Sequence, residues 1–575
     1  MILKALYDYY NRCGDLPEFG MEEKEIGFLV VISKDGEFIR FEDCRIDKER
    51  ARRYLVKKQI GRSSGVVANY LYDNCTYVLG YSSDRNLEKE QKCLDAFKAK
   101  VESIADSFPG NVDMRAVRSF YRQDRNSIVS QIEGDPLWDE IKNNLSKKFS
   151  FFSFRIEGED KILAEKKELL QLESGDVKEN KGCVCLVTGD RGIPVKTTTA
   201  TMIAGSQATA KIVAFQVDSG YDSYGKKQCD NAPISEIAEF AYTTALNAML
   251  QRDSHNKFTL GNRTFVFWAS SKTEVAEQAE NSLLDLLGCS EDARDDPNAK
   301  VEQVKKVFTS IYSGGLKTSL DDRFYILGLA PNSARIAVIY WSESSLKDFA
   351  GKILRHLYDM EIIDTRKDKK PYAGVKDMLS AVALNGKQSE VEPNLPDAVV
   401  RSTFQGLPYP NALLSACIRR IRAESTGGNA VRIGRAAIIK AYLNRTNTTD
   451  KRIEIMLDKS NTNQGYLCGR LFAVLDRIQE YANGINTIRE RYMNAASSTP
   501  SAVFSTILNI SLHHLEKLPN EGKKVFYEKL EQEIMDKMPA DGFPAHLDLQ
   551  DQGRFFIGYY HQRQDFFLKK DDANI

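Results

Sequence analysis

The sequence predicts an α+β fold, in which a mixed α/β N-terminal and central body is followed by an all-α C-terminal four-helix bundle. Two observations carry this prediction. Strand-like apolar runs alternate with amphipathic helical patterns through most of the chain, whereas from Met456 onward only helical spacing remains. At 575 residues and 42% hydrophobic content, the chain is long enough for two to four packed domains.

The N-terminal region, residues 1–182, begins with a helical pattern and a β-hairpin. Leu3, Leu6 and Tyr9 share one side of the expected helix. The runs IGFLVVIS and EFIRFEDC follow, joined through an Asp-Gly pair, which is a strong hairpin signal between two β-rich segments. Residues 88–107 have the mixed charge and apolar spacing of an exposed amphipathic helix.

The central body, residues 183–400, is predicted to be α+β. Five runs read as strands: CVCLVTG, KIVAFQV, RTFVFWA, RFYILGLA and RIAVIYW. The segment SEIAEFAYTTALNAML reads as a helix, and the polar stretches 290–300 and 386–397 read as loops.

A basic helical connector, residues 401–455, leads into the predicted bundle, residues 456–575. Four helical patterns follow Met456, and they lie within residues 467–481, 503–515, 526–538 and 555–567. Helices joined by short loops can bury their apolar stripes against one another as a bundle.

Composition limits the partners and cofactors. The net charge is zero, so only local clusters can argue for nucleic acid. The sequence contains neither the roughly 18 uninterrupted apolar residues of a membrane span nor a signal peptide's apolar block, so a soluble, cytoplasmic protein without a membrane partner is expected. The ten cysteines form no C-x-x-C pair and the six histidines no H-x-x-x-H pair, so neither a metal nor a cofactor is expected.

The segment CLVTGDRGIPVKTTT, residues 185–199, is a poor phosphate-binding loop. Such a loop needs a glycine directly before its lysine, but Val195 precedes Lys196. Pro194 removes a backbone amide, and Asp190 stands where the loop's first glycine belongs. The segment is therefore interpreted as a strand that leaves into a loop. An NTPase built on it, or a nuclease, is the enzymatic alternative to a chain that is not an enzyme.

Two segments carry local positive charge. Residues 45–62 contain eight basic residues against two acidic ones, and the Gly-Ser turn that follows could bring backbone amides close to a phosphate. Residues 401–445 contain seven arginines and one lysine against Glu424 alone, which favours forked contacts to phosphate oxygens. The alternative for the second segment is a solvated helix face that pairs with acidic neighbours.

At these residues the chain resembles the large subunit of subtype I-C CRISPR effector complexes (Cascade), the Csd1-like family. The resemblance runs almost end to end through ordered motifs, which are MILKALYDYY, SSGVVANYLYDNCTYVLGY, CLVTGD, FQVDSGYDSYGKKQCDNAPISE, FYILGLAPNSARIAV, GLPYPNALLSACIRRIRAE and GYLCGRLFAVLDRIQ. It implies a non-catalytic subunit of an RNA-guided antiviral surveillance complex. This subunit would recognise the protospacer-adjacent motif and help to open and hold the target DNA.

The resemblance also implies the partners. They are guide RNA, contacted near its 5′ end, target double-stranded DNA, the backbone and guide-processing subunits, a separately made small subunit, and a helicase-nuclease recruited after DNA binding. A pure scaffold without motif discrimination is the third interpretation.

Site residues follow from the resemblance as expectations. The turn at residues 61–73 would read the flanking motif, with Asn69 as the base-edge contact and Gly65 permitting close approach. The supporting residues of this turn are Ser63, Ser64, Lys57, Lys58 and Arg62. A second set would contact nucleic-acid backbone or seat the bundle, and it comprises Arg419, Arg420, Arg422, Arg432 and Arg435. Met456 would be the internal start of the small subunit, giving 575 − 456 + 1 = 120 residues.

Overall fold

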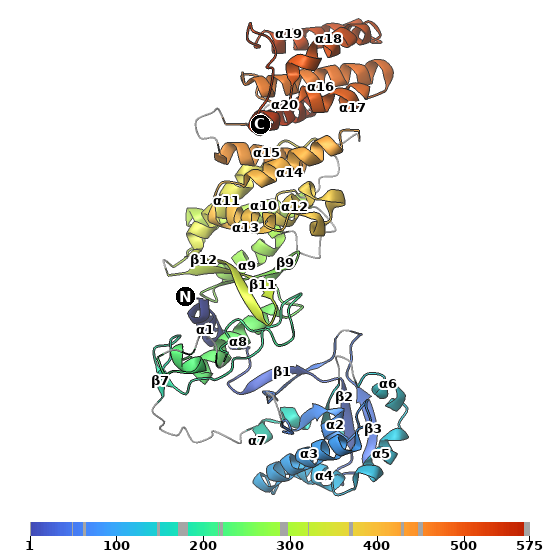
Figure 1. Ribbon diagram of the computed structural model, residues 1–575, viewed down its shortest axis with the longest axis vertical. Helices are drawn as coiled ribbons and strands as arrows, with labels where there is room; N and C mark the ends of the chain where they lie inside the picture. The colour runs from blue at the N-terminus through green and yellow to red at the C-terminus, as the bar shows by residue number, and fades with distance from the viewer. Residues whose placement is uncertain are drawn as a thin grey trace. The chain divides into compact units, whose positions relative to one another are not determined.

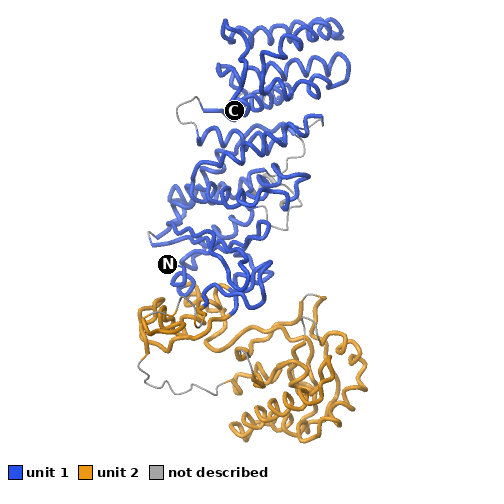
Figure 2. The backbone as a smooth tube through the Cα atoms, viewed as in Figure 1, with its two compact units in different colours: residues 1–8, 200–214, 247–575 blue, residues 9–199, 215–246 orange. Residues whose placement is uncertain are grey.

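The computed structural model confirms the α+β class, with helices and several small sheets (Figure 1). It describes residues 2–48, 50–60, 65–145, 150–170, 182–216, 218, 222, 224–287, 297–319, 321–366, 372–426, 430–446 and 452–568. The chain forms two compact units (Figure 2). Unit 1 contains Met1–Asp8, Ala200–Ala214 and Asn247–Ile575, and unit 2 contains Tyr9–Thr199 and Phe215–Leu246. The four domain ranges predicted from the sequence divide the chain more finely than these two units, and they stay a prediction.

The core of unit 2 is a four-stranded mixed sheet in the order β3-β2-β6-β5. Strand β2 (Phe28–Ile32) pairs antiparallel with β3 (Phe38–Asp43) and parallel with β6 (Phe151–Ile156), which pairs antiparallel with β5 (Tyr72–Asn74). All five residues of β2 are buried, as a continuous apolar run predicts for a central strand. Because β2 and β3 are consecutive and antiparallel, the expected hairpin is confirmed.

Helices from the segment between β5 and β6 pack with this sheet. They are α2 (Cys75–Val78), α3 (Leu87–Ser107), α4 (Val112–Phe120), α5 (Arg125–Glu133) and α6 (Trp138–Lys142). The predicted helix over 88–107 is α3, and it begins where the Asn86 side chain accepts a bond from the Lys89 amide at 3.1 Å. Helix α4 contacts β2 and β6. A buried apolar core thus lies between this sheet and its helices.

Smaller elements complete unit 2. They are the antiparallel pair β1 (Met21–Glu25) and β4 (Arg53–Lys57), the turn η1 (Leu163–Glu165), helix α7 (Lys167–Leu170), the pair β7 (Cys183–Val184) and β8 (Arg191–Gly192), and the turn η2 (Gln228–Asn231). The division between the units falls within two predicted helices that the structure confirms, α1 (Ile2–Arg12) and α8 (Glu236–Leu250).

The run KIVAFQV does not form the predicted strand. Within its described residues, 211–216, only Lys211 makes a β-bridge, to Arg335. Val217 lies outside the described residues. A β-branched run becomes a strand only when a partner edge pairs with it, and here the pairing stops after one residue.

Unit 1 contains an antiparallel sheet in the order β12-β11-β10-β9. Its strands are β9 (Lys257–Leu260), β10 (Arg263–Ala269), β11 (Arg323–Asn332) and β12 (Arg335–Ser345). The last three correspond to predicted runs and are confirmed. Aromatic rings stack across the strands, and the ring centroids of Phe258 and Phe265 are 4.8 Å apart.

Helices follow the sheet strands in unit 1. They are α9 (Glu274–Leu287), α10 (Pro297–Ser313), α11 (Leu346–Met360), α12 (Val375–Val382), α13 (Leu395–Gln405), α14 (Asn411–Ala423) and α15 (Ile433–Thr446), with the turns η3 (Leu384–Gly386) and η4 (Gln388–Glu390). Residues 290–296 of one predicted loop lie outside the described residues, and α10 begins at Pro297. A single buried apolar cluster extends from the sheet through these helices into the C-terminal region.

The C-terminal region contains five helices rather than the predicted four, all within the described residues 452–568. They are α16 (Gln464–Asn483), α17 (Thr487–Ala496), α18 (Pro500–Glu516), α19 (Glu521–Met535) and α20 (Leu549–Asp565). Helix α17 was missed because half of its sequence, TIRERYMNAA, is polar and its apolar residues form only a short stripe.

Helices α16 and α20 run parallel in close contact. Gly465 of α16 faces Asp551 of α20, and one turn further along Gly469 faces Phe555. The missing side chains of the two glycines let the helix backbones meet. Among the described residues, no helix is both long and apolar enough to cross a membrane.

Candidate nucleic-acid interface

In the first basic segment, residues 45–62, some of the cations pair with carboxylates of the chain itself. Arg45 donates to both carboxylate oxygens of Asp43, at 2.9 and 2.6 Å, and also lies against Glu140. These carboxylates and hydrogen bonds raise the pKa of Arg45. Lys58 donates to the Thr199 hydroxyl at 2.8 Å, and its Nζ lies 3.8 Å from a carboxylate oxygen of Glu239. Arg45 and Lys58 therefore hold unit 2 together.

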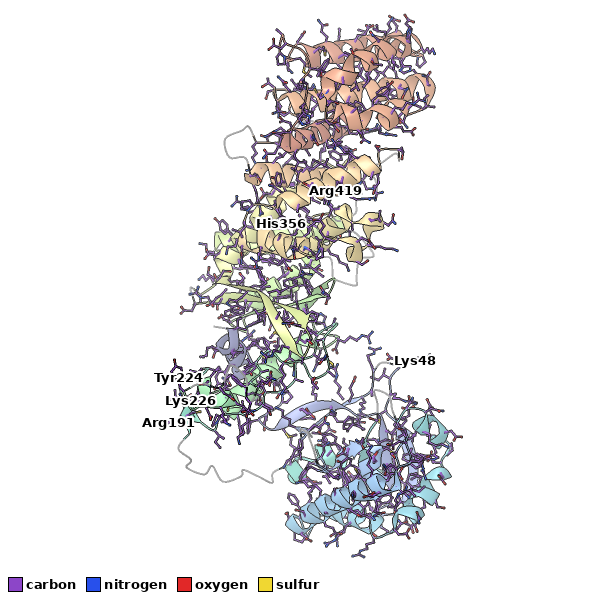
Figure 3. The ribbon with its side chains drawn as sticks, viewed as in Figure 1. Lys48, Arg191, Tyr224, Lys226, His356 and Arg419 are labelled. Carbon is purple, nitrogen blue, oxygen red and sulfur yellow. The ribbon has the colours of Figure 1, made fainter. Side chains whose placement is uncertain are left out.

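Other cations of this segment lie at the surface. Lys48 is exposed (Figure 3). The Nζ of Lys57 lies 4.2 Å from the ring centroid of Tyr70, which orients the lysine beside the start of the predicted reading turn. Arg62, Ser63 and Ser64, three of the predicted site residues, lie outside the described residues.

Asn69 closes the base of the predicted turn. Its side-chain oxygen accepts a bond from the backbone N–H of Ile60 at 3.0 Å, and its backbone N–H donates to the carboxylate of Asp73 at 2.8 Å. Asn69 is 1% exposed, and its Nδ2 has no hydrogen-bond partner in the part of the chain that the structure describes. In this conformation the amide faces the chain, so a base-edge contact requires Asn69 to leave the Ile60 bond. The base-edge role stays a prediction, whereas the contacts describe a positioning residue.

Gly65 meets the requirement for close approach. Its φ is +135°, a conformation that other residues rarely adopt, and a Cβ built there would have no atom of the described residues within 4 Å. The neighbouring Val66 and Val67 are exposed. The backbone at Gly65 is thus accessible to a ligand.

In the second basic segment, three predicted site residues share Glu424. Arg420 reaches it at 2.5 Å, Arg435 at 2.7 and 2.9 Å, and Arg432 at 3.4 Å. Hydrogen bonds from Arg435 lead the interactions that lower the pKa of Glu424 to about 2, against the opposing effect of burial. Glu424, the segment's one acidic residue, is thus the centre of an arginine cluster.

Two of the five arginines make structural contacts. Arg435 is buried, and it also donates to the carbonyl oxygens of Ala381 at 2.9 Å and Ala430 at 2.8 Å. Arg422 of α14 donates to the side chain of Gln552 in α20 at 3.1 Å, and burial lowers its pKa. These contacts support the bundle-seating alternative for Arg422.

Two others remain at the surface. The side chains of Arg419 and Arg432 are 63% and 64% exposed, and Arg419 pairs with Glu392 at 2.6 Å (Figure 3). Surface pairs of this kind contribute at most about 1 kcal/mol, so a phosphate can replace the carboxylate at little cost. Among the five predicted arginines, Arg419 and Arg432 are best placed for a nucleic-acid backbone.

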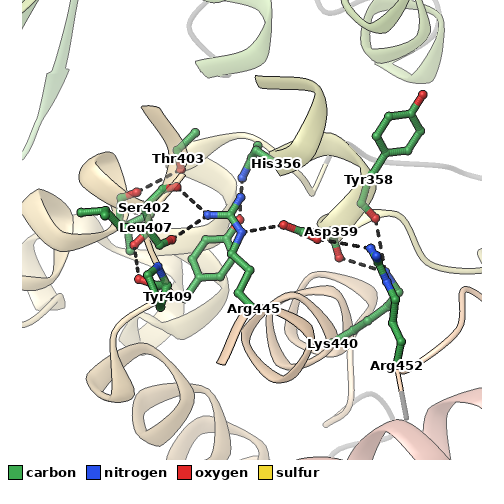
Figure 4. A network of polar contacts seen from close by, with 12 residues as sticks. His356, Tyr358, Asp359, Ser402, Thr403, Leu407, Tyr409, Lys440, Arg445 and Arg452 are labelled. Atoms are coloured by element: carbon green, nitrogen blue, oxygen red, sulfur yellow. Dashed lines mark hydrogen bonds and ion pairs between the residues drawn. The ribbon is translucent and has the colours of Figure 1, made fainter. Parts of the chain in front are cut away.

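The last two cations of the segment belong to a buried network around Asp359 (Figure 4). Arg445 donates to Asp359 at 2.5 Å and to the carbonyl oxygens of Ser402 and Leu407. Lys440 donates to the carbonyl of Asp359 at 3.0 Å, and burial lowers the pKa of Lys440 to about 8. This network was missed because its centre lies over 80 residues upstream of both cations.

The segment 185–199 does not have the arrangement of a phosphate-binding loop. Short strands β7 and β8 flank its turn, and Lys196 is exposed. No helix follows Lys196 within the described residues 182–216. Among the described residues, no three His, Cys, Asp or Glu side chains lie together so that they could hold one metal ion.

The comparison with known families identifies the class of protein. A family model described as "CRISPR-associated protein (Cas_Csd1)" matches residues 6–567, nearly the whole chain. The chain is therefore a CRISPR-associated protein. Within that class it belongs to the Csd1 family. A search of the curated proteins found no significant match to this chain.

Proposed function

We propose that this chain is the non-catalytic large subunit of an RNA-guided CRISPR surveillance complex of subtype I-C. The observation that carries the proposal is the family match over residues 6–567. In this function guide RNA reads the target by base pairing, while the chain recognises the short protospacer-adjacent motif and helps to open and hold the duplex. It also contacts the guide's 5′ end and the backbone subunits, and it helps to recruit a helicase-nuclease.

The flanking-motif reader is proposed at residues 57–73. Lys57 at the end of β4 supplies charge, and Gly65 supplies accessible backbone. Asn69 fixes the end of the turn through Ile60 and Asp73. A turn whose base is fixed loses less conformational entropy when it binds DNA, which supports this location.

The test is binding of duplex DNA by the guide-loaded complex, with and without this chain, at two salt concentrations and across a panel of flanking motifs. We expect tight binding only with the chain and only for some flanks. Equal binding without the chain would reduce its role to scaffolding or recruitment. Lys196→Ala tests the enzymatic alternative, because ATP hydrolysis that disappears in this variant would contradict a non-catalytic subunit.

The separate small subunit is proposed to begin at Met456. This residue precedes α16, and helices α16 to α20 all follow it. Changing the Met456 codon should remove a product of 120 residues (575 − 456 + 1) while the full-length chain persists. Met535→Leu, a change within the same product, is the control and should leave the product present. A short product of unchanged mass after the Met456 change would rule out this start.

A further inference from the structure

A small cavity lies where helices α17 and α20 meet the residues that lead into α15. Its volume is about 60 Å³. The polar side chains that line it are Arg489, Arg563, Tyr559, Tyr560 and Gln564, and none of its described lining residues is a carboxylate. Two arginines thus line one partly open cavity.

Arg489 is the more deeply buried of the two, at 4% exposure, and its Nε has no hydrogen-bond partner among the described residues. Its nearest carboxylate oxygen, in Asp476, is 3.6 Å from Nη1, beyond hydrogen-bond distance. An unsatisfied donor on a buried cation is costly, so an acceptor in the cavity would stabilise Arg489, although the Oδ1 of Asp476, which also has no partner within the described chain, is a second group that could accept from it.

The neighbouring carboxylates do not balance the cations. The same oxygen of Asp476 already accepts bonds from Arg563 at 2.8 Å and from the Tyr559 hydroxyl at 2.9 Å. Glu480 pairs with Arg477 at 2.7 Å and lies 3.8 Å from Arg563. Among the described residues, three guanidinium groups therefore share two carboxylates, which leaves one positive charge in excess within a largely buried cluster.

We propose that this cavity binds a phosphate group, held by the guanidinium groups of Arg489 and Arg563. Guanidinium forks match the oxygen spacing of phosphate, and a phosphate would neutralise the excess charge. One water-sized group needs roughly 10–15 Å³ of cavity volume. The cavity volume of about 60 Å³ therefore accommodates the four oxygens of a phosphate. This inference is independent of the proposed role of residues 57–73.

The phosphate could be inorganic or part of a nucleic acid. Arg477, which shares Glu480 with Arg563, lies 4.2 Å from the ring centroid of Tyr481 and 5.0 Å from that of Phe567. Both rings are partly exposed, and Lys523 lies 4.2 Å from the centroid of Tyr481. Exposed aromatic rings beside cations are typical stacking surfaces for single-stranded bases. The test therefore includes both sources.

The experiment uses the full chain and two probes. Thermal unfolding is measured in inorganic phosphate against sodium chloride of equal ionic strength, and binding of a fluorescent ten-nucleotide single strand is measured by anisotropy. The variants are Arg489→Gln and the charge-retaining Arg489→Lys. The control is Arg491→Gln, because Arg491 lies on the same helix but is exposed.

We expect phosphate to raise the melting temperature of the wild type and of Arg491→Gln, but not of Arg489→Gln. If the phosphate of a nucleic acid occupies the cavity, Arg489→Gln should also weaken oligonucleotide binding about tenfold. If inorganic phosphate alone occupies it, oligonucleotide affinity should stay unchanged. A wild type that phosphate stabilises no more than chloride does would overturn the proposal and leave water in the cavity. Because phosphate also stabilises folded proteins that have no phosphate site, a rise in the wild type alone does not decide the question, and Arg489→Lys serves as the comparison if Arg489→Gln fails to fold.

Discussion

Gly469 and Phe555 bring two helices into backbone contact, since a side-chain carbon on Gly469 of α16 would overlap the carbonyl oxygen of Phe555 in α20. The contact is repeated in the other direction, where a carbon on Gly558 of α20 would overlap the carbonyl oxygen of Tyr466. Neither obstacle is a movable side chain. The two glycines of GYLCGRLF, Gly465 and Gly469, therefore allow the backbone of α16 to pack directly against that of α20.

We expect Gly469→Ala to destabilise unit 1 by about 3 kcal/mol, because the two helices must separate to admit one methyl group. Calorimetric melting of the full chain measures the effect. Gly434→Ala in α15 is the control, since its added carbon would meet only the side chains of Ala381 and Tyr372, at 3.5 and 3.7 Å. Equal melting temperatures for both variants would contradict the close approach.

Arg445 and Arg452 both pair with Asp359 but should differ in their contribution to stability. Arg445 is buried and also satisfies two carbonyls, so Arg445→Met should cost about 3 kcal/mol by leaving Asp359 short of a partner. Arg452 is 63% exposed and 3.5 Å from the carboxylate, so Arg452→Met should cost less than about 1 kcal/mol. Chemical unfolding of the two variants compares them. A larger loss for Arg452→Met would contradict the burial argument.

Buried His356 should make unit 1 sensitive to acid. Burial lowers its pKa from 6.5 to about 4, and its ring nitrogens lie 2.7 Å from the Tyr409 hydroxyl and the Ala373 carbonyl. Between these values the unfolded state binds a proton that the folded state does not. Stability is therefore complete above about pH 6.5 and falls by about 3 kcal/mol toward pH 4.

His356→Gln should flatten this pH dependence, while His513→Gln, which replaces an exposed histidine, should retain it. Melting temperatures between pH 4 and pH 7 measure the slope. The same slope in wild type and His356→Gln would assign the acid sensitivity elsewhere, for example to buried His561, whose pKa burial lowers to about 3.

Replacing Arg419 and Arg432 together by Gln should reduce the salt dependence of DNA binding by the guide-loaded complex. Each lost phosphate contact lowers the slope of log K against log salt by about 0.9, so two contacts would remove about 2. Arg491→Gln is the exposed control. An unchanged slope would return both arginines to the alternative of a solvated helix face.

Asn69→Ala should relax discrimination between flanking motifs. The substitution removes the acceptor for the Ile60 amide, so hydrogen exchange at Ile60 should accelerate even without DNA. Faster exchange together with lost discrimination would indicate positioning of the turn. Lost discrimination with unchanged exchange would instead favour direct contact with a base, and unchanged discrimination would remove Asn69 from the site.

The fold could be predicted wherever local pattern and tertiary partner agreed. The hairpin at Asp35-Gly36 and helix α3 carry strong local signals, and both were predicted. The strand prediction for residues 211–217 was wrong, because a strand forms only where a second strand pairs with it, and that partner lies far away in the sequence.

The candidate site was harder to predict from the sequence, because counting the charges within one segment ignores acidic partners from other segments. Glu392 pairs with Arg419, and Asp359 takes up Arg445 from 86 residues away. A local signal did exist for the phosphate cavity. Asp476 interrupts the apolar run LFAVLDRI, and a carboxylate at such a position requires buried cations nearby.

The parallel contact between α16 and α20 also has a consequence for folding kinetics. Arg470 and Gln562, hydrogen-bonded across this pair, are 92 residues apart in the sequence, so helices α17 to α19 must be traversed before the pair can close. An all-helical region usually folds quickly because its contacts are local, but the entropy of this long closure raises the barrier. The region should therefore fold more slowly than its helix content suggests.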